Sequence, residues 1–221
     1  MRPALLALVV LAFAVGCGAS DNESAGTTTT TTATTATGGE CASVDAPKPR
    51  DPGSNEAPTA PREDGKTYSL IFDTSCGSFT VTLDAELAPN TAASLVALAQ
   101  AGYFDDTIFH RVVPGFVIQG GDPLQTGLGG PGYSTVDVPP SDAVFTKGTV
   151  AMAKSGVEAP GTAGSQFFVV TADDAGLPPE YAIVGEVTDG LDVVELIGTL
   201  GDAAEKPTRP IVISSVTVTE S

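Results

Sequence analysis

Few residues of this chain are able to do chemistry, and the most informative of them is an arginine inside an apolar strand. Arg111 lies within residues 109–122, Phe-His-Arg-Val-Val-Pro-Gly-Phe-Val-Ile-Gln-Gly-Gly-Asp. An arginine among apolar residues is unfavourable unless it is paired or functional, so Arg111 is either half of a structural ion pair or the cation of a site. His110 is the only histidine. Strand alternation points it to the face opposite Arg111, so we interpret it as structural.

The remaining composition excludes several kinds of site. One histidine cannot form a multi-histidine metal centre, and three cysteines are too few for a four-cysteine zinc site or a disulfide scaffold. The serine-nucleophile patterns G-x-S-x-G and S-x-x-K do not occur in the sequence. Asp and Glu outnumber Lys and Arg by 27 to 10, and the resulting net charge of −17 argues against a nucleic-acid partner. The composition therefore excludes these metal sites and argues against a nucleic-acid partner.

The first 65 residues are predicted to lie outside the folded domain. Residues 4–15 are all apolar and follow Arg2, which is typical of an export signal and too short for a membrane span. The next residues, ending Ala-Val-Gly-Cys, resemble a bacterial lipobox. In that interpretation residues 1–16 are the signal peptide and Cys17 carries a lipid that holds the protein on the outer side of the bacterial cell membrane. The alternative is an ordinary secretory signal with an incidental cysteine.

Residues 17–65 are rich in Thr, Pro and Gly and nearly lack large aliphatic side chains. Such a segment buries too little apolar surface to offset its chain entropy, so it predicts a disordered tether. Either export route leads to an oxidising compartment. With Cys17 lipidated, Cys41 and Cys76 remain as an even pair, and we predict a disulfide between them that fastens the tether to the domain.

Residues 66–221 have the size and patterning of one β-rich domain. Residues 67–73 and 78–84 alternate apolar and polar side chains, which predicts a hairpin of half-buried antiparallel strands. Period-3.6 spacing predicts helices at 89–101 and 191–197. Further short strands are expected at 108–113, 116–119, 148–153, 166–171, 182–187 and 211–219. Seven or eight strands with two helices favour a closed or nearly closed barrel, because closure removes exposed edges.

The segment 109–122 resembles the signature of the cyclophilins, the cyclosporin-binding class of peptidyl-prolyl cis/trans isomerases. Residues 151–153, 164–168, 184–187 and 190–194 resemble later segments of the same family in the same order. The resemblance covers nearly all of the domain and none of the tether. It implies a mainly β fold, a closed eight-stranded antiparallel barrel capped by two α-helices.

The implied reaction explains why no nucleophile, metal or cofactor is needed. Amide resonance gives an X–Pro bond a rotation barrier of about 18–20 kcal/mol, and no covalent bond breaks during rotation. An enzyme for this reaction must bind the twisted amide better than either planar form. A fixed cation beside an apolar socket for the proline ring would do so.

Carried over by position, the resemblance assigns each site residue. Arg111 is implied to be the catalytic cation, Gln119 to orient it and contact the substrate backbone, and Phe116 to complete the catalytic set. Phe116 also forms part of the wall of the proline pocket. The implied substrate-binding residues are Val117, Ala153, Lys154, Gln166, Phe168, Leu177 and Tyr181. Four positions depart from the common family pattern, namely Val117 for Met, Lys154 for Asn, Gly176 for Trp and Tyr181 for His.

These assignments predict an exported isomerase that assists the folding of proteins outside the cytoplasmic membrane. Its expected partners are proline-containing peptides and unfolded exported proteins, with the membrane reached through the lipid, and we expect a monomer. One alternative is a catalytically weak peptide-binding or chaperone module on the same fold, which turnover of a proline tetrapeptide distinguishes from the isomerase. A second alternative is a β-rich solute-binding lipoprotein; the shallow groove that the motif implies argues against it, and ligand screening by thermal shift would test it.

Overall fold

The computed structural model describes residues 39–58 and 65–221 of the 221-residue chain. The predicted signal peptide, Cys17 and the Thr-rich run lie outside the described residues. None of the helices in the described ranges combines the length and the apolar character that crossing a bilayer requires.

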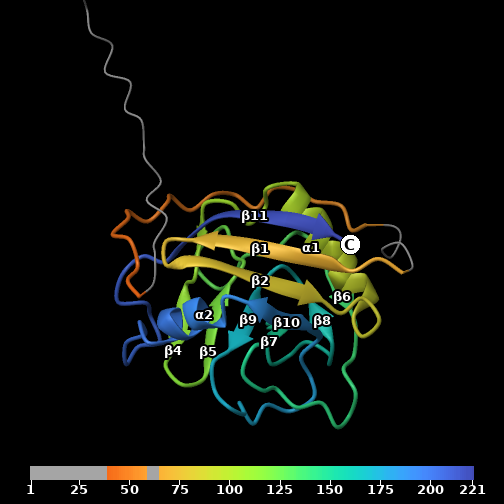
Figure 1. The fold of residues 1–221 in the computed structure, drawn as a ribbon. Coiled ribbons are helices and arrows are strands. Elements are labelled where there is room, and N and C mark those ends of the chain that lie inside the picture. Colours follow the sequence, from red (N-terminus) through yellow and green to blue (C-terminus); the bar gives the residue numbers. More distant parts are fainter. Residues whose placement is uncertain (1–38, 59–64) are drawn as a thin grey trace, which may run out of the picture. The chain divides into compact units, whose positions relative to one another are not determined.

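Antiparallel strands form the framework of the domain (Figure 1). The helices are α1 (Pro89–Gln100) and α2 (Leu191–Gly198). The strands are β1 (Tyr68–Thr74), β2 (Gly77–Leu83), β3 (Thr107–Ile108), β4 (Arg111–Val113), β5 (Val117–Gly120), β6 (Thr135–Val136), β7 (Thr149–Met152), β8 (Thr162–Ala163), β9 (Phe167–Val170), β10 (Ile183–Asp189) and β11 (Val212–Glu220). Nine of them make one sheet in the order β3-β11-β1-β2-β10-β7-β9-β5-β4, and β6 pairs with β8.

The sheet is curled, and its two edge strands, β3 and β4, follow one another in the sequence. Only Phe109 and His110 separate β3 from β4. The backbone changes partner at this point, because the Phe109 N–H donates to the Ile211 carbonyl while Arg111 pairs with β5. The predicted closed barrel of eight strands is therefore corrected to a curled nine-stranded sheet, in which one expected strand is split in two.

The core follows the alternation that the sequence predicts. Tyr68, Leu70 and Phe72 of β1 are buried, while the residues between them are only partly so. The alternate residues Phe79, Val81 and Leu83 of β2 are buried too. This pattern sets the register of the hairpin, because a shift by one residue would turn every apolar side chain outward.

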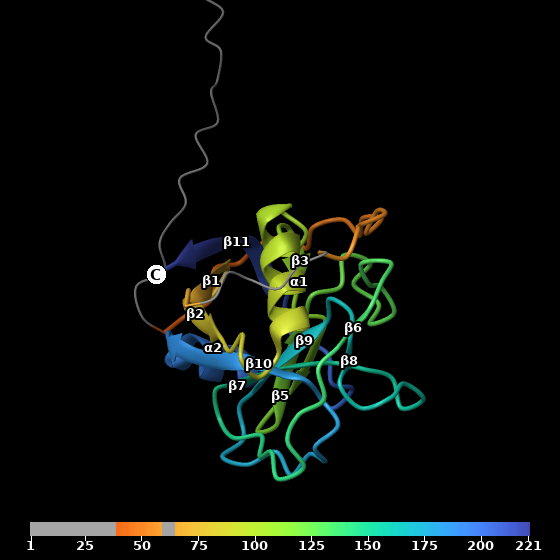
Figure 2. The same cartoon turned by 90° about the vertical axis from the view of Figure 1, so that its right-hand side faces the viewer.

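The two helices pack against different parts of the curled sheet (Figure 2). Helix α1 starts at Pro89, which needs no N–H partner in the first turn, and ends before Gly102 at φ +68°. It contacts β11, β1 and β6. Helix α2 buries Val194 and Ile197 and contacts β2, β4 and β5.

Residues 39–58, which we call the strap, lie along the domain as an extended segment (Figure 1). The predicted disulfide between Cys41 and Cys76 is confirmed. Backbone hydrogen bonds join the strap to the domain, among them Ala42 N to Ser75 O at 2.7 Å and Arg50 N to Pro123 O at 3.0 Å. The prediction of a disordered tether over residues 17–65 is therefore wrong for the strap, because backbone and side-chain polar contacts hold it where apolar burial does not.

Candidate active site

The strand register brings the predicted catalytic residues into one row. Arg111 on β4 is paired with Gln119 on β5, Gln119 is paired with Phe168 on β9, and Phe168 is paired with Ala151 on β7. Residues directly opposite one another in adjacent strands point to the same face. The cation, its amide neighbour and an aromatic side chain therefore share one surface of the sheet.

A cleft of about 240 Å³ opens on this surface. All predicted catalytic and substrate-binding residues except Gln166 line it. They are Arg111, Phe116, Val117, Gln119, Ala153, Lys154, Phe168, Leu177 and Tyr181. Its volume suits a single small ring, and its walls are apolar except at the arginine and glutamine edge and at Lys154.

An aromatic cluster supports the wall of the cleft. The rings of Phe168 and Tyr181 meet edge to face with centroids 5.6 Å apart. Phe145 lies beneath them, fully buried, with its centroid 6.5 Å from Phe168 and 6.1 Å from Tyr181. The sequence analysis missed Phe145, since it stands outside every recognisable motif and no local pattern separates it from the main core.

Arg111 is held from two sides. Its Nε donates to Glu205 Oε2 at 2.7 Å, and its Nη1 donates to Gln119 Oε1 at 3.3 Å. Within the described ranges no hydrogen bond uses Nη2, and the side chain keeps 32% of its surface exposed at the cleft. The arginine therefore combines the two alternatives from the sequence, because it has a carboxylate partner and still presents an N–H group to the cleft.

Glu205 is the second residue that sequence reasoning missed. It lies in the turn before β11, far from Arg111 along the chain, and it adopts a left-handed backbone conformation with φ +61°. Its carbonyl accepts a hydrogen bond from Val112 N, so the turn is fixed to β4 beside the arginine. No signal in the sequence marks one carboxylate among 27 acidic residues.

Gln166 lies in a second, adjoining cavity of about 730 Å³. Its Oε1 accepts from Gln119 Nε2 at 3.1 Å, and its Nε2 donates to the Gly129 carbonyl at 2.9 Å. Gln119, Ala153 and Lys154 line both cavities. An extended chain with a ring in the small cleft can therefore continue into the larger cavity.

Lys154 brings no free positive charge to the groove. Its Nζ lies 3.1 Å from Glu180 Oε2 and 5.4 Å from the Tyr181 ring centroid, and its side chain is only 3% exposed. The ammonium is therefore neutralised locally and braces the cleft wall.

His110 is buried in the two-residue link between β3 and β4, and it is not among the residues that line the cleft. Burial lowers the pKa of the imidazole below its ordinary value, although the nearby Asp122 carboxylate acts in the opposite direction. A neutral, buried ring away from the cleft fits a structural role.

Comparisons with known proteins agree with this geometry. The family model of the cyclophilin type peptidyl-prolyl cis-trans isomerase/CLD matches residues 69–218. A probable peptidyl-prolyl cis-trans isomerase A of Mycobacterium leprae is 39% identical over 177 residues, which covers 69% of this chain and 96% of the relative. A peptidyl-prolyl cis-trans isomerase-like 1 protein of Aspergillus fumigatus is 40% identical over 146 residues, 64% of this chain and 88% of the relative.

Solved structures give the same result. The chain is similar to a Cryptosporidium parvum cyclophilin type peptidyl-prolyl cis-trans isomerase with a TM-score of 0.64 and 31% identity, over 69% of this chain and 98% of that one. A structure of that protein in the presence of the dipeptide Ala-Pro gives a TM-score of 0.63. The family match, the relatives and the row of Arg111, Gln119 and Phe168 lead to one conclusion: this chain belongs to the cyclophilin-type peptidyl-prolyl cis-trans isomerases.

Proposed function

We propose that this isomerase works outside the cytoplasmic membrane, held there by a lipid on Cys17, and assists the folding of exported proteins. The observation that carries the proposal is the Cys41–Cys76 disulfide, because such bonds form and persist in oxidising compartments. The apolar N-terminal run and the lipobox-like Ala-Val-Gly-Cys supply an export route and an anchor that agree with it.

The cleft suggests how each residue contributes to rotation about the X–Pro bond. The apolar walls hold the proline ring, and Arg111 lies at their polar edge. In the twisted amide the lone pair of the prolyl nitrogen is localised on that atom, whereas resonance delocalises it in either planar form. A guanidinium N–H donated to that lone pair stabilises the twisted form selectively, which is the condition for catalysis.

The substrate class follows from the two adjoining cavities. The Cryptosporidium protein was crystallised in the presence of the dipeptide Ala-Pro, and the small cleft of this chain has a volume of about 240 Å³. The 730 Å³ cavity beside it offers room for further residues of an unfolded chain. The preferred partners are therefore extended segments of unfolded exported proteins with an exposed proline.

Anchoring is tested by labelling cells with a fatty-acid probe. The wild-type chain should take up the label and fractionate with membranes, whereas Cys17→Ser should remain unlabelled. Cys17→Ser protein should keep wild-type turnover of a proline tetrapeptide in vitro. An unlabelled wild-type chain would refute the lipid anchor, and a folded chain without turnover would favour the peptide-binding alternative.

A further inference from the structure

The strap contacts one particular loop of the domain at three points. Residues 122–133, which we call the groove loop, form one wall of the 730 Å³ cavity through residues 127–133. Gln125 Nε2 donates to the Pro47 carbonyl at 3.0 Å, and Arg50 N donates to the Pro123 carbonyl at 3.0 Å. Asn55 donates from Nδ2 and from its backbone N to the Pro131 carbonyl, at 3.3 and 3.4 Å. The strap therefore holds the groove loop near both of its ends.

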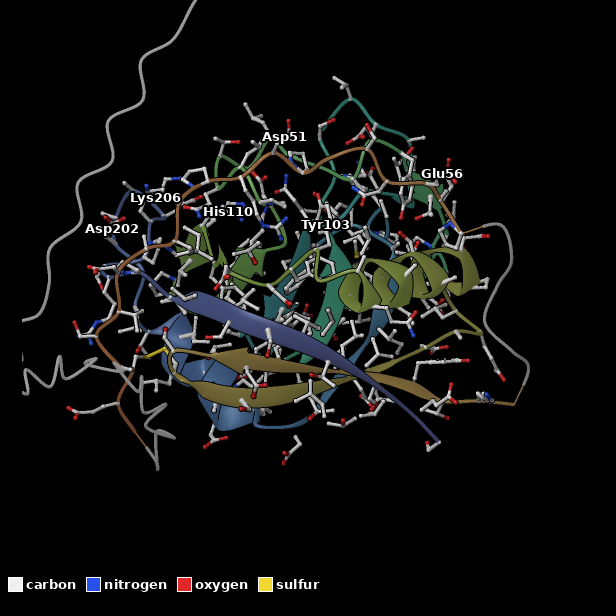
Figure 3. The ribbon with its side chains drawn as sticks, turned by 90° about the horizontal axis from the view of Figure 1, so that it is seen from above. Asp51, Glu56, Tyr103, His110, Asp202 and Lys206 are labelled. Atoms are coloured by element: carbon white, nitrogen blue, oxygen red, sulfur yellow. A yellow bond between two sulfur atoms is a disulfide. The ribbon has the colours of Figure 1, made fainter. Side chains whose placement is uncertain are left out.

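Arg50 fastens the middle of the strap to the domain. Its guanidinium donates to the carbonyls of Gly102 and Asp105 at 3.1 Å each and to that of Tyr103. It also lies over the Tyr103 ring, 5.9 Å from the centroid. These three carbonyls belong to the turn that follows α1, beyond its C-cap Ala101. Figure 3 shows the strap, with Asp51 and Glu56 labelled on it, passing Tyr103.

Hydrogen bonds within the groove loop connect its parts to one another. Burial opposes the charge of Asp122, but N–H groups of Gly129, Leu124, Gly127 and Thr126 outweigh it and hold the pKa of this carboxyl below its ordinary value. The carboxylate thus ties both ends of residues 122–129 together, with bonds of 2.7 to 2.9 Å from Leu124, Thr126 and Gly127. A side chain at Gly129 would collide with it, because a Cβ there would lie 1.9 Å from Asp122 Oδ1.

The groove loop in turn contacts the catalytic residues. The Gly129 carbonyl accepts from Gln166, Gln166 accepts from Gln119, and Gln119 accepts from Arg111. An unbroken series of hydrogen bonds therefore runs from the strap-held loop to the catalytic guanidinium. It consists of three side chains, so a displaced loop would leave Gln166 without its fixed partner.

We propose that the strap is a positioning element of the isomerase site, which sets the groove loop and, through Gln166 and Gln119, the wall that receives the residues flanking proline. The proposal rests on the isomerase activity of the site. It assigns catalytic consequence to a segment that lies outside the residues matched by the family model, 69–218. The effect of the strap on KM should therefore be larger for a substrate that occupies more of the larger cavity.

The test compares Arg50→Ala with Lys48→Ala in the full chain. Lys48 carries the same charge on the same strap, is exposed, and has no hydrogen bond or ion pair to other described residues. Two substrates are used, a proline tetrapeptide and a longer peptide with several residues on each side of its proline. Arg50→Ala should raise KM for the longer peptide about fivefold, the size of one lost hydrogen bond, and raise it less for the tetrapeptide. Lys48→Ala should match wild type on both.

A second variant separates positioning from stability. Gln125→Ala removes a strap-to-loop bond without touching α1, and it should also raise KM for the longer peptide more than for the tetrapeptide. Hydrogen exchange should become faster in residues 122–133 in both variants. An unchanged KM for the longer peptide in either variant, with faster exchange in the loop, would overturn the proposal. If the wild-type protein turned over neither peptide, the result would contradict the isomerase function itself and not only the role of the strap.

Discussion

At the scale of single residues, the site depends on which hydrogen-bond partner each nitrogen of the Arg111 guanidinium has. Nε and Nη1 of Arg111 donate to Glu205 and Gln119, and these bonds fix the plane of the group. A planar guanidinium held through two of its nitrogens loses little freedom when Nη2 donates to a substrate. Because Glu205 is 51% exposed, the ion pair is worth only about 0–1 kcal/mol to stability, so its main effect is orientation.

Arg111→Ala should reduce kcat/KM about 100-fold or more, because removal of one donor to developing charge has effects of that size. Arg111→Lys should retain a small part of the activity, since an ammonium keeps the charge but not the fork. Turnover of a proline tetrapeptide measures both, and thermal unfolding should show a folded protein. Wild-type turnover by a folded Arg111→Ala variant would disprove the mechanism.

Glu205 allows activity and stability to be separated. Its φ of +61° disfavours any side chain but suits glycine. Glu205→Gly and Glu205→Ala should both lower kcat about tenfold with little change in KM, as expected when a positioning contact equivalent to about 1.4 kcal/mol is lost. The free energy of unfolding should be about 1 kcal/mol higher for Glu205→Gly than for Glu205→Ala, because glycine adopts this backbone conformation without strain.

Kinetics and chemical denaturation on the two variants provide the measurement. Equal activity of Glu205→Ala and wild type would remove Glu205 from the list of positioning residues.

His110 makes folding sensitive to mild acid. Burial lowers its pKa, with Asp122 opposing and Lys206 and Arg111 adding smaller effects in the same direction. The unfolded state therefore binds a proton near pH 6.5 that the folded state does not, so the free energy of unfolding should fall as pH drops below about 6.5. His110→Gln should lose this part of the pH dependence.

Because His110 is the only histidine, its ring proton resonances can be followed by NMR without ambiguity. The midpoint of that titration should lie below about 6.5. A midpoint at or above this value would contradict the assignment of a neutral buried ring.

At the scale of elements, the strap and the first hairpin are joined covalently. The disulfide spans 35 residues of sequence and connects the strap to the turn between β1 and β2. Cross-links of this length restrict the unfolded chain, and a Cys41→Ser, Cys76→Ser double variant should lose about 2–4 kcal/mol of unfolding free energy. Urea denaturation measures the change. Unaltered stability would mean that the cross-link itself contributes nothing to the free energy of unfolding.

Alternation explains how much of the fold the sequence predicts. Leu70 and Phe79 stand in period-two runs, so the hairpin, its register and the buried face follow from the pattern alone. The same period places Arg111 and Gln119 on one face once their strands pair. The assignment of their roles came from the family resemblance, since an isolated arginine on a strand has two interpretations.

The strap and Glu205 could not be predicted because neither has a periodic apolar pattern. Arg50 stands among Pro, Lys and Asp, a composition that usually remains solvated. Its position depends on three carbonyls in the turn that follows α1, which are brought to the strap only when the domain has folded. Contacts of this kind are polar and join residues far apart in the sequence, so no local sequence pattern predicts them.

At the scale of the whole molecule, the strongly negative charge should select among substrates. The chain has a net charge of −17, and both cations of the groove, Arg111 and Lys154, are paired with carboxylates. Backbone hydrogen bonding from Ser155 also lowers the pKa of Glu158 on the wall of the larger cavity, which keeps that group ionised. The groove therefore has no unpaired positive charge among its described residues to oppose the attraction between the negative protein and a cationic peptide.

A proline peptide flanked by lysines should show a kcat/KM about tenfold higher than one flanked by glutamates at low ionic strength. The ratio should approach one in about 1 M salt, where the screening length is about 3 Å. A serine-flanked peptide serves as the neutral reference. A ratio that does not change with salt would show that direct contacts, rather than the field of the molecule, decide the preference.

The position of the disulfide also determines where the domain would bear mechanical load. A pull on the chain before Cys41 passes through the sulfur–sulfur bond into Cys76 and the β1–β2 turn. The rest of the strap, including Arg50 and its contacts, lies beyond that junction. If the chain is held at a membrane while it works on a bound client, the disulfide provides a path for the force that does not run through the groove loop.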